Sequence, residues 1–337
     1  MVKTPVGLVT AALTAAILLA ATFLIATKTR GEDTTFASSA GQLEVQTVAG
    51  GLVHPWALAF LPDSKMLVTE RPGRMRIVSV EGQLSPPLKG VPDVWASGQG
   101  GLLDVVTDKA FAQNRTIYFC FSERTSGGGR TAVARAKLND GNGRLDEVKI
   151  IFRQDGPLSS GNHYGCRIVQ ANDGNLFVTL GEHFSYRNEA QNLGNHLGKL
   201  IRIAPDGSAP PDNPFVGRDG AKPEIWSFGH RNEQGLAINP ASGELWEIEH
   251  GPRGGGEVNI IGKGKNYGCR RSATASTTAA PRFTRRLQRT AWSSRSSTGC
   301  RRSRRRAWRS TPENCFRNGT AVCSPARWPA RCWCGCH

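Results

Sequence analysis

Between residues 56 and 252, one pattern of apolar and polar positions recurs four times. A strand of small apolar residues is followed by a turn with Pro, Asp, Asn or Gly, and then by a second strand rich in Leu, Val, Phe and Thr. The four copies are WALAFLPDSKMLVTERPG (56–73), LLDVVTDKAFAQNRTIYFCFSE (102–123), GCRIVQANDGNLFVTLGEH (165–183) and QGLAINPASGELWEIEHGP (234–252). The second strands are expected to end near Thr69, Ser122, Thr179 and Glu247.

This repeat predicts an all-β fold. The expected strand ends are 53, 57 and 68 residues apart, and further strands fit between them at 75–80, 131–138 and 199–205. No window after the N-terminal segment shows sustained helical periodicity. Units of this length, built from short strands and Gly/Pro turns, are typical of β-propeller blades. A β-sandwich would need shorter spacing, and a TIM barrel would need helices between the strands. We therefore predict a β-propeller with about four blades present.

An uncharged stretch of 22 residues, from Pro5 to Ala26, lies near the N-terminus. It is long enough to cross a hydrocarbon core of roughly 30 Å and longer than the usual apolar region of a cleaved signal. Residues 1–30 are therefore interpreted as a signal peptide or an N-terminal membrane anchor. We expect a linker at 31–42 and the propeller at 43–268. Either interpretation predicts a periplasmic or extracellular protein, free or attached to the inner membrane.

The charge and the cysteines are concentrated in the last part of the chain. The net charge is +16, but residues 269–337 alone carry 16 Arg, no Lys and one acid, Glu313. The same segment holds seven Cys and four Trp, whereas residues 31–268 contain only Cys120 and Cys166. Two cysteines do not imply a disulfide framework. A basic arm for nucleic acid normally mixes Lys with Arg, and a zinc module needs paired ligand spacings. No nucleic-acid partner is expected.

A shifted reading frame explains the composition of residues 269–337. Arg codons of the form CGN, read one base earlier, become codons for Ala, Pro, Ser or Thr. Cys and Trp codons become codons for Leu, Met or Val. The shifted reading permits the string SGMAFYTG…GSLFAGALAG, which repeats the strand pattern found upstream. We interpret 269–337 as a frameshift product; the alternative is a native basic tail that binds nucleic acid or anionic lipid.

Polar residues gather at the strand ends of the third and fourth copies. SSGNHYG and LGEHF flank strands of the third copy, and FGHRNEQG and EHGPRGGGEVN flank strands of the fourth. Because the loops at one mouth of a propeller converge, side chains from these segments are expected to meet. The residues concerned are His163, Glu182, His183, His230, Arg231 and Asn232. Of these, His183 and His230 are interpreted as structural.

These segments resemble the soluble pyrroloquinoline-quinone (PQQ) dependent aldose sugar dehydrogenases, also called the glucose/sorbosone dehydrogenase family. The matching stretches are HPWALAFLPD, GQGGLLDV, SSGNHYGCRIV, HLGKLIRI, DNPF, FGHRNEQGLA, EHGPRGGGEVN and KNYG. The resemblance covers about residues 43–268, and the shifted string GYGIDYSG also resembles the family's continuation. It implies a six-bladed propeller that oxidises the anomeric carbon of aldoses to lactones, with PQQ as hydride acceptor and with calcium. The electron acceptor that follows PQQ is not implied.

The resemblance also implies roles for single residues. His163 matches the base that removes the proton of the anomeric hydroxyl, and an imidazole can accept a proton near neutral pH. Glu182 falls at the acidic position that orients or charge-balances this histidine. Arg231 matches the cation beside the quinone oxygen that gains charge, which is electrostatic stabilisation. Asn232 and Gln99 fall at positions that contact the cofactor.

Four residues match calcium positions of the family. Gly251 and Pro252 match backbone carbonyl ligands of a calcium ion that holds PQQ, and oxygen ligands suit this cation. Glu257 and Tyr267 match positions of a further calcium site.

One departure from the family pattern limits these expectations. The family also holds the carboxylates of PQQ with basic residues from later blades, which the chain lacks in its printed frame. An open propeller leaves unpaired strand edges, so the chain as translated is expected to fold poorly and to be inactive. The alternative function is a non-catalytic propeller that binds a sugar or a protein partner.

Overall fold

A computed structural model of the chain describes residues 34–156, 158–252 and 255–269. The described residues fall into two compact units that divide between Gly50 and Gly51. The first contains a hairpin of β1 (Thr34–Ser38) and β2 (Gly41–Val45), with Thr34 paired to Val45 and Ser38 to Gly41. This hairpin forms in and just after the residues that the sequence suggests as a linker.

The second unit consists of four antiparallel sheets, each made of strands in chain order. The first sheet contains β3 (Pro55–Phe60), β4 (Met66–Glu70) and β5 (Arg74–Val78). The second contains β6 (Leu102–Thr107), β7 (Thr116–Arg124), β8 (Gly129–Leu138) and β9 (Leu145–Arg153). The third contains β10 (Gly165–Gln170), β11 (Leu176–Leu180), β12 (Lys199–Ile203) and β13 (Ile225–Phe228). The fourth contains β14 (Glu233–Ile238), β15 (Leu245–Glu249) and β16 (Glu257–Ile261).

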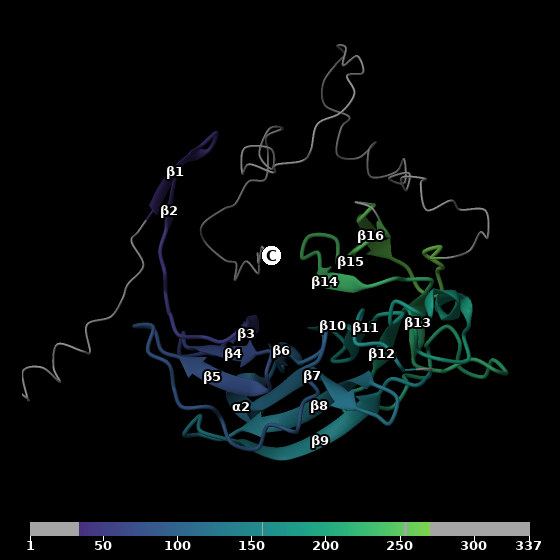
Figure 1. Cartoon of the computed structure of the whole chain (residues 1–337), viewed down its shortest axis with the longest axis horizontal. Helices are drawn as coiled ribbons and strands as arrows, with labels where there is room; N and C mark the ends of the chain where they lie inside the picture. Colours follow the sequence, from purple (N-terminus) through teal and green to yellow (C-terminus); the bar gives the residue numbers. More distant parts are fainter. Residues whose placement is uncertain (1–33, 157, 253–254, 270–337) are drawn as a thin grey trace, which may run out of the picture. The chain divides into compact units, whose positions relative to one another are not determined.

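The sheets contact one another through their first strands. β3 contacts β6, β6 contacts β10, and β10 contacts β14. Figure 1 shows the four sheets following one another in chain order, from β3 to β16. The described ranges contain two short helices, α2 (Phe111–Asn114) and the 3-10 helix η1 (Arg187–Gln191). The fold is therefore all-β and of the β-propeller type with four blades present, as predicted.

The repeated sequence pattern follows from this arrangement. The first strands carry small buried residues, such as Ala57, Ala59 and Cys166, which allow neighbouring sheets to approach closely. The second strands β4, β7 and β11 are largely apolar because both of their faces are covered, and every residue of β11 is buried. β15 differs, because it exposes Ile248 and buries Glu247 and Glu249. The expected ends near Thr69, Ser122, Thr179 and Glu247 all lie in the second strands β4, β7, β11 and β15.

A buried hydroxyl joins each sheet to the next. Thr69 Oγ1 donates to the Leu103 carbonyl at 2.6 Å, which links the first sheet to the second. Thr131 Oγ1 donates to the Tyr164 carbonyl at 2.9 Å, which links the second sheet to the loop that enters the third. Thr179 Oγ1 donates to the Glu233 carbonyl at 3.3 Å, which links the third to the fourth. Buried polar groups need such partners, so each link favours one placement of the next sheet.

The fourth sheet has Ile248 at the equivalent position. Thr69 pairs with Ala57 directly after a register shift, and Ile248 pairs with Gly235 in the same way. The two threonines of this position, Thr69 and Thr179, are 0% exposed, whereas Ile248 is 55% exposed. Within the described ranges, no further sheet follows the fourth. Ile248 is therefore an exposed apolar side chain at a position where Thr69 and Thr179 bind the next sheet.

A register shift lies at the start of the first strand in every sheet. The shifts fall at Pro55/Ala57, Leu102/Val105, Gly165/Ile168 and Glu233/Gly235. Bulges of this kind bend a strand and redirect the neighbouring side chains. They therefore shape the loops that enter the first strands at one end of the sheets, which we call the mouth.

Cys120 in β7 and Cys166 in β10 form a disulfide, with their Cα atoms 5.8 Å apart. The bond connects the second and third sheets. The two cysteines implied no disulfide framework, and the structure shows a single bond between them, which the sequence analysis did not predict. The pairing depends on β7 and β10 lying side by side, which the spacing of 46 residues does not reveal.

Removing this disulfide is expected to lower the free energy of unfolding by about 2–5 kcal/mol, because the unfolded chain loses a cross-link. The test compares denaturant unfolding of the chain with that of the Cys120→Ala/Cys166→Ala variant. Adding a reductant to the unchanged chain should reproduce the loss and should not affect the variant. Equal stability of the chain with and without reductant would contradict the prediction.

Within the described ranges, no helix is long and apolar enough to cross a membrane. The expected signal peptide or anchor at 1–30 lies outside these ranges, as do residues 270–337 of the predicted frameshift product.

Candidate active site

Three charged or titratable side chains meet at the mouth between the third and fourth sheets. His163 precedes β10, Glu182 follows β11, and Arg231 precedes β14. β14 contacts both β10 and β11, so these three strand ends are neighbours. The His163 Nδ1 atom lies 3.1 Å from Glu182 Oε1, and the same oxygen lies 3.9 Å from Arg231 Nε. The structure thus brings the expected base, acid and cation into one group.

Glu182 is fully buried at the centre of this group. Neither of its carboxylate oxygens has a well-aligned hydrogen-bond donor among the described residues, and the same is true of His163 Nδ1. Unpartnered buried polar atoms are rare and call for a physical reason. A proton on His163 Nδ1 would face Glu182, which leaves Nε2 as the proton acceptor of the ring.

The backbone of His163 is held in an unusual conformation. Its φ is +54°, in the left-handed region that few non-glycine residues adopt. Its N–H donates to Gln99 Oε1 at 2.8 Å, and its carbonyl accepts from the His183 N–H at 3.3 Å. A Cβ at Gly181 would lie only 1.9 Å from the His163 carbonyl, so glycine is required there. Gln99, expected to contact the cofactor, therefore holds the backbone of His163 in this structure.

Arg231 and Asn232 connect the mouth to the strands beneath it. The Arg231 N–H donates to Glu249 Oε2 at 2.6 Å, and its Nη1 donates to the His250 carbonyl at 2.8 Å. Asn232 Oδ1 accepts hydrogen bonds from the Gly165 N–H at 3.2 Å and from a neighbouring glutamine side chain at 3.0 Å. Asn232 is buried, and its carbonyl oxygen ties β10 to the start of β14.

His183 is a buried brace. Its Nε2 lies 2.8 Å from Gln154 Oε1, and its ring packs edge-on against Tyr164. Burial lowers the pKa of His183 to about 4, so the ring stays neutral at physiological pH. This environment fits the structural role expected for His183. Gln154 has no distinctive sequence signal.

Of the residues that match calcium positions, Gly251 and Pro252 follow β15, Glu257 begins β16, and Tyr267 lies beyond β16. A Cβ on Gly251 would lie 1.6 Å from the Gly255 carbonyl, so this turn needs glycine. The Pro252 carbonyl accepts from the Gly255 N–H at 3.0 Å. Glu257 pairs with Glu249 across the two strands. The Tyr267 hydroxyl donates to the Ile260 carbonyl and accepts from the Gly262 N–H, both at 2.8 Å, so it braces this region.

A cluster of buried carboxylates beneath Arg231 was not anticipated. Glu233, Glu247 and Glu249 are each at most 5% exposed. Burial, together with the neighbouring carboxylates, raises the pKa of Glu247 to about 9 and that of Glu233 well above its ordinary value. Burial lowers the pKa of the nearby Lys199 to about 7. In the sequence, these glutamates look like exposed strand positions, so only the packing reveals them.

The chain is similar in sequence to several known proteins, including sugar dehydrogenases. The family model of glucose/sorbosone dehydrogenases matches residues 52–284. The aldose sugar dehydrogenase YliI of Escherichia coli is 50% identical over 228 residues, which are 67% of this chain and 61% of that protein. Quinoprotein glucose dehydrogenase B of Acinetobacter calcoaceticus is 30% identical over 250 residues, 66% of this chain and 51% of that protein. The chain thus spans less than two thirds of the length of these relatives.

The chain is also similar to a solved structure of an aldose sugar dehydrogenase. The PQQ-bound aldose sugar dehydrogenase of Streptomyces coelicolor is 31% identical and superimposes with a TM-score of 0.60. The match covers 70% of this chain and 68% of that protein.

Proposed function

The chain belongs to the glucose/sorbosone dehydrogenase family, and on this premise we propose that it carries the catalytic part of a sugar-oxidising quinoprotein. Its substrates are aldoses, the reaction oxidises the anomeric carbon to a lactone, and PQQ accepts the hydride. The observation that carries the proposal is the group of His163, Glu182 and Arg231 at the mouth. A non-catalytic sugar-binding propeller would not need a buried carboxylate behind a histidine.

The residues present fit PQQ and calcium at this mouth. The fit rests on the His163–Glu182 pair, on the adjacent Arg231, and on the backbone at Gly251 after β15, where only glycine is accommodated. When bound, PQQ would supply a hydride acceptor, and calcium would be held by the carbonyl oxygens of Gly251 and Pro252 and would supply a Lewis acid. Asn232 and Gln99 line the same loops. Glu257 and Tyr267 are proposed near a second calcium ion.

The side chains then have distinct tasks. His163 Nε2 accepts the proton of the anomeric hydroxyl as the hydride leaves the anomeric carbon. Glu182 keeps the Nδ1 proton of His163 in place and stabilises the imidazolium that forms, because it is buried only 3.1 Å away. Arg231 supplies a fixed positive charge next to this group, where negative charge develops on the acceptor. The proton lost by the anomeric hydroxyl is therefore accounted for, because it resides on His163 when the lactone is released.

We also propose an exported protein, in the periplasm or outside the cell. The disulfide between Cys120 and Cys166 supports this location, because such bonds persist in oxidising compartments. Membrane attachment through residues 1–30 remains part of the proposal.

The test uses a frame-restored chain, defined as the chain whose codons after residue 268 are read one base earlier. After incubation with PQQ and Ca²⁺, addition of glucose or another aldose is expected to reduce a dye acceptor. Omitting PQQ should abolish dye reduction. Sugar binding without dye reduction in the presence of PQQ would support the non-catalytic propeller and contradict our proposal.

A further inference from the structure

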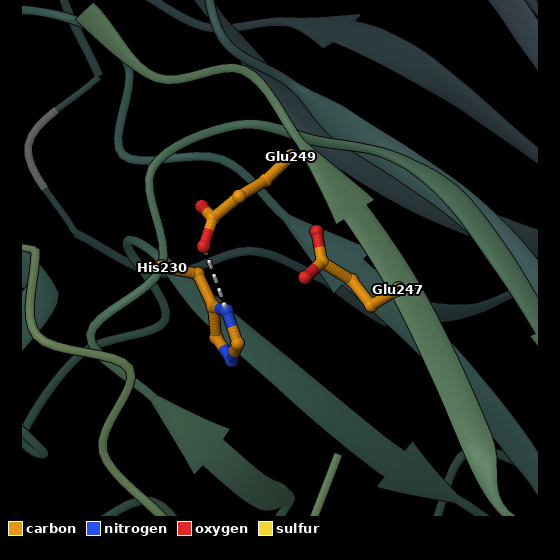
Figure 2. Close-up of side chains that lie close together, drawn as sticks. All are labelled: His230, Glu247 and Glu249. Carbon is orange, nitrogen blue, oxygen red and sulfur yellow. Dashed lines mark ion pairs between the residues drawn. The ribbon is translucent and has the colours of Figure 1, made fainter. Parts of the chain in front are cut away.

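His230, Glu247 and Glu249 form a compact buried cluster beneath the mouth. Their ligand atoms all lie within 4.8 Å of one another. His230 lies in the loop before β14, and the two glutamates are two residues apart in β15, so their side chains leave the same face of the strand. Figure 2 shows the three side chains converging on one point between them.

The ring of His230 is oriented from its far side. Its Nε2 lies 2.8 Å from Ser227 Oγ, and its ring stacks on that of Tyr267 with centroids 4.6 Å apart. Its Nδ1 is fully buried without a hydrogen-bond partner in the described ranges, 3.7 Å from Glu249 Oε1 (Figure 2). In the tautomer whose Nε2 donates to Ser227 Oγ, the Nδ1 lone pair faces the carboxyl groups and can bind a cation between them. In the other tautomer, Nδ1–H faces Glu249 Oε1.

The two carboxylates are also held in position. Asn259 Nδ2 donates to Glu247 Oε2 at 3.0 Å and to Glu249 Oε1 at 3.2 Å. The second oxygen of Glu249 accepts from the Arg231 N–H, whereas Glu247 Oε1 is buried without a hydrogen-bond partner in the described ranges. Glu247 Oε1 and His230 Nδ1, which lack hydrogen-bond partners in the described ranges, therefore face the same point. Both side chains are positioned by hydrogen bonds from residues outside the cluster, as the ligands of metal ions are.

The nearby lysine does not fill this point. Lys199 Nζ donates to the backbone carbonyls of Glu189, Ala190 and Leu197, not to a carboxylate of the cluster. Glu233, which is buried with both oxygens unpartnered in the described ranges, adds a further carboxylate. Burial disfavours the ionised forms of these carboxyl groups, so they stay neutral unless a cation lies among them.

We propose that His230, Glu247 and Glu249 bind one divalent transition-metal ion that ties the loop before β14 to β15. One imidazole nitrogen with two carboxylates suits manganese, iron or zinc, whereas calcium takes oxygen ligands alone. Donor atoms about 2.0–2.2 Å from a tetrahedral ion lie roughly 3.4 Å apart, so small side-chain movements close the site. It differs from the calcium site proposed at Gly251 and Pro252, which uses backbone carbonyls, and it requires neither PQQ nor sugar.

The probe is Mn²⁺, because the six cysteines in residues 270–337 would capture zinc. Both the 337-residue chain and the frame-restored chain are stripped of metal and then saturated with Ca²⁺, which fills the all-oxygen sites. Free Mn²⁺ is followed by electron paramagnetic resonance during titration. We expect one Mn²⁺ bound per chain and a rise in melting temperature on binding.

Glu247→Gln keeps the shape and the Asn259 contact but removes the anionic ligand, so Mn²⁺ should bind at least about tenfold more weakly. The matched control is Glu244→Gln, an exposed glutamate just before β15, which should bind as the unchanged chain does. His230→Gln repeats the comparison from the second element. The proposal is overturned if neither unchanged chain binds Mn²⁺ stoichiometrically in excess Ca²⁺, or if both ligand variants bind with unchanged affinity.

Discussion

Restoring the shifted frame after residue 268 is expected to convert a chain without measurable turnover into an active sugar dehydrogenase. The restored chain should reach a kcat on the order of 1–10³ s⁻¹ with PQQ, Ca²⁺ and an aldose. The physical reason is that the fourth sheet exposes Ile248 and Ile260, at 55% and 38%, where another blade would cover them. The later blades would also supply the basic residues that hold the carboxylates of PQQ.

The measurement begins with the gene. Sequencing across the codons for Tyr267 to Arg271 should reveal a single-base change that restores the reading frame encoding further propeller blades. Dye reduction is then compared between the two purified chains at equal concentrations. PQQ-dependent turnover by the 337-residue chain would contradict the prediction, and so would stop codons that interrupt the shifted frame.

His163→Gln in the frame-restored chain is expected to lower kcat by about 10²–10⁴-fold, because the anomeric hydroxyl loses its proton acceptor. PQQ stoichiometry should be unchanged, since the amide of glutamine occupies a similar volume. Steady-state dye reduction gives kcat and KM, and the absorbance of bound PQQ gives the stoichiometry. A loss of PQQ instead of a loss of kcat would assign His163 to cofactor binding.

Two variants serve as comparisons for this result. His54→Gln changes the exposed histidine directly before β3 in the first sheet and should retain most of the activity. Glu182→Gln leaves the base in place but removes its buried charge, so an intermediate loss is expected, with a change in the pH profile of kcat. If His54→Gln impairs turnover as strongly as His163→Gln, the base is not specific to the third sheet.

The repeated strands could be predicted because their pattern has one cause. A strand covered on both faces is mostly apolar, and β11 is buried along its whole length with Thr179 as its one polar side chain. The meeting of His163, Glu182 and Arg231 was predictable for a related reason: first strands begin and second strands end at the same mouth. The family resemblance assigned tasks to these residues, and the geometry shows that they are close enough to act together.

Other features depend on which strands become neighbours, and the sequence pattern does not contain that information. The disulfide needs β7 beside β10, although its cysteines are 46 residues apart. The buried glutamates resemble ordinary solvent-facing positions of a strand, and the side chain of Gln99 reaches the backbone of His163 across 64 residues. Each contact is set by the packing of whole sheets rather than by local preference.

The hydroxyl hydrogen bonds between sheets all run the same way along the chain, from each sheet to the one that follows it. Thr69, Thr131 and Thr179 each find their acceptor in the sheet, or the loop entering it, that comes next along the chain. A chain exported from its N-terminus would therefore complete these links in the order in which its sheets emerge. Folding would then proceed from the N-terminal blade to the C-terminal blade, and each folded blade would provide the surface on which the next one docks. A ribosomal or mutational error late in the gene would leave the earlier junctions between sheets intact. Only the junction after the last correctly encoded sheet would be lost.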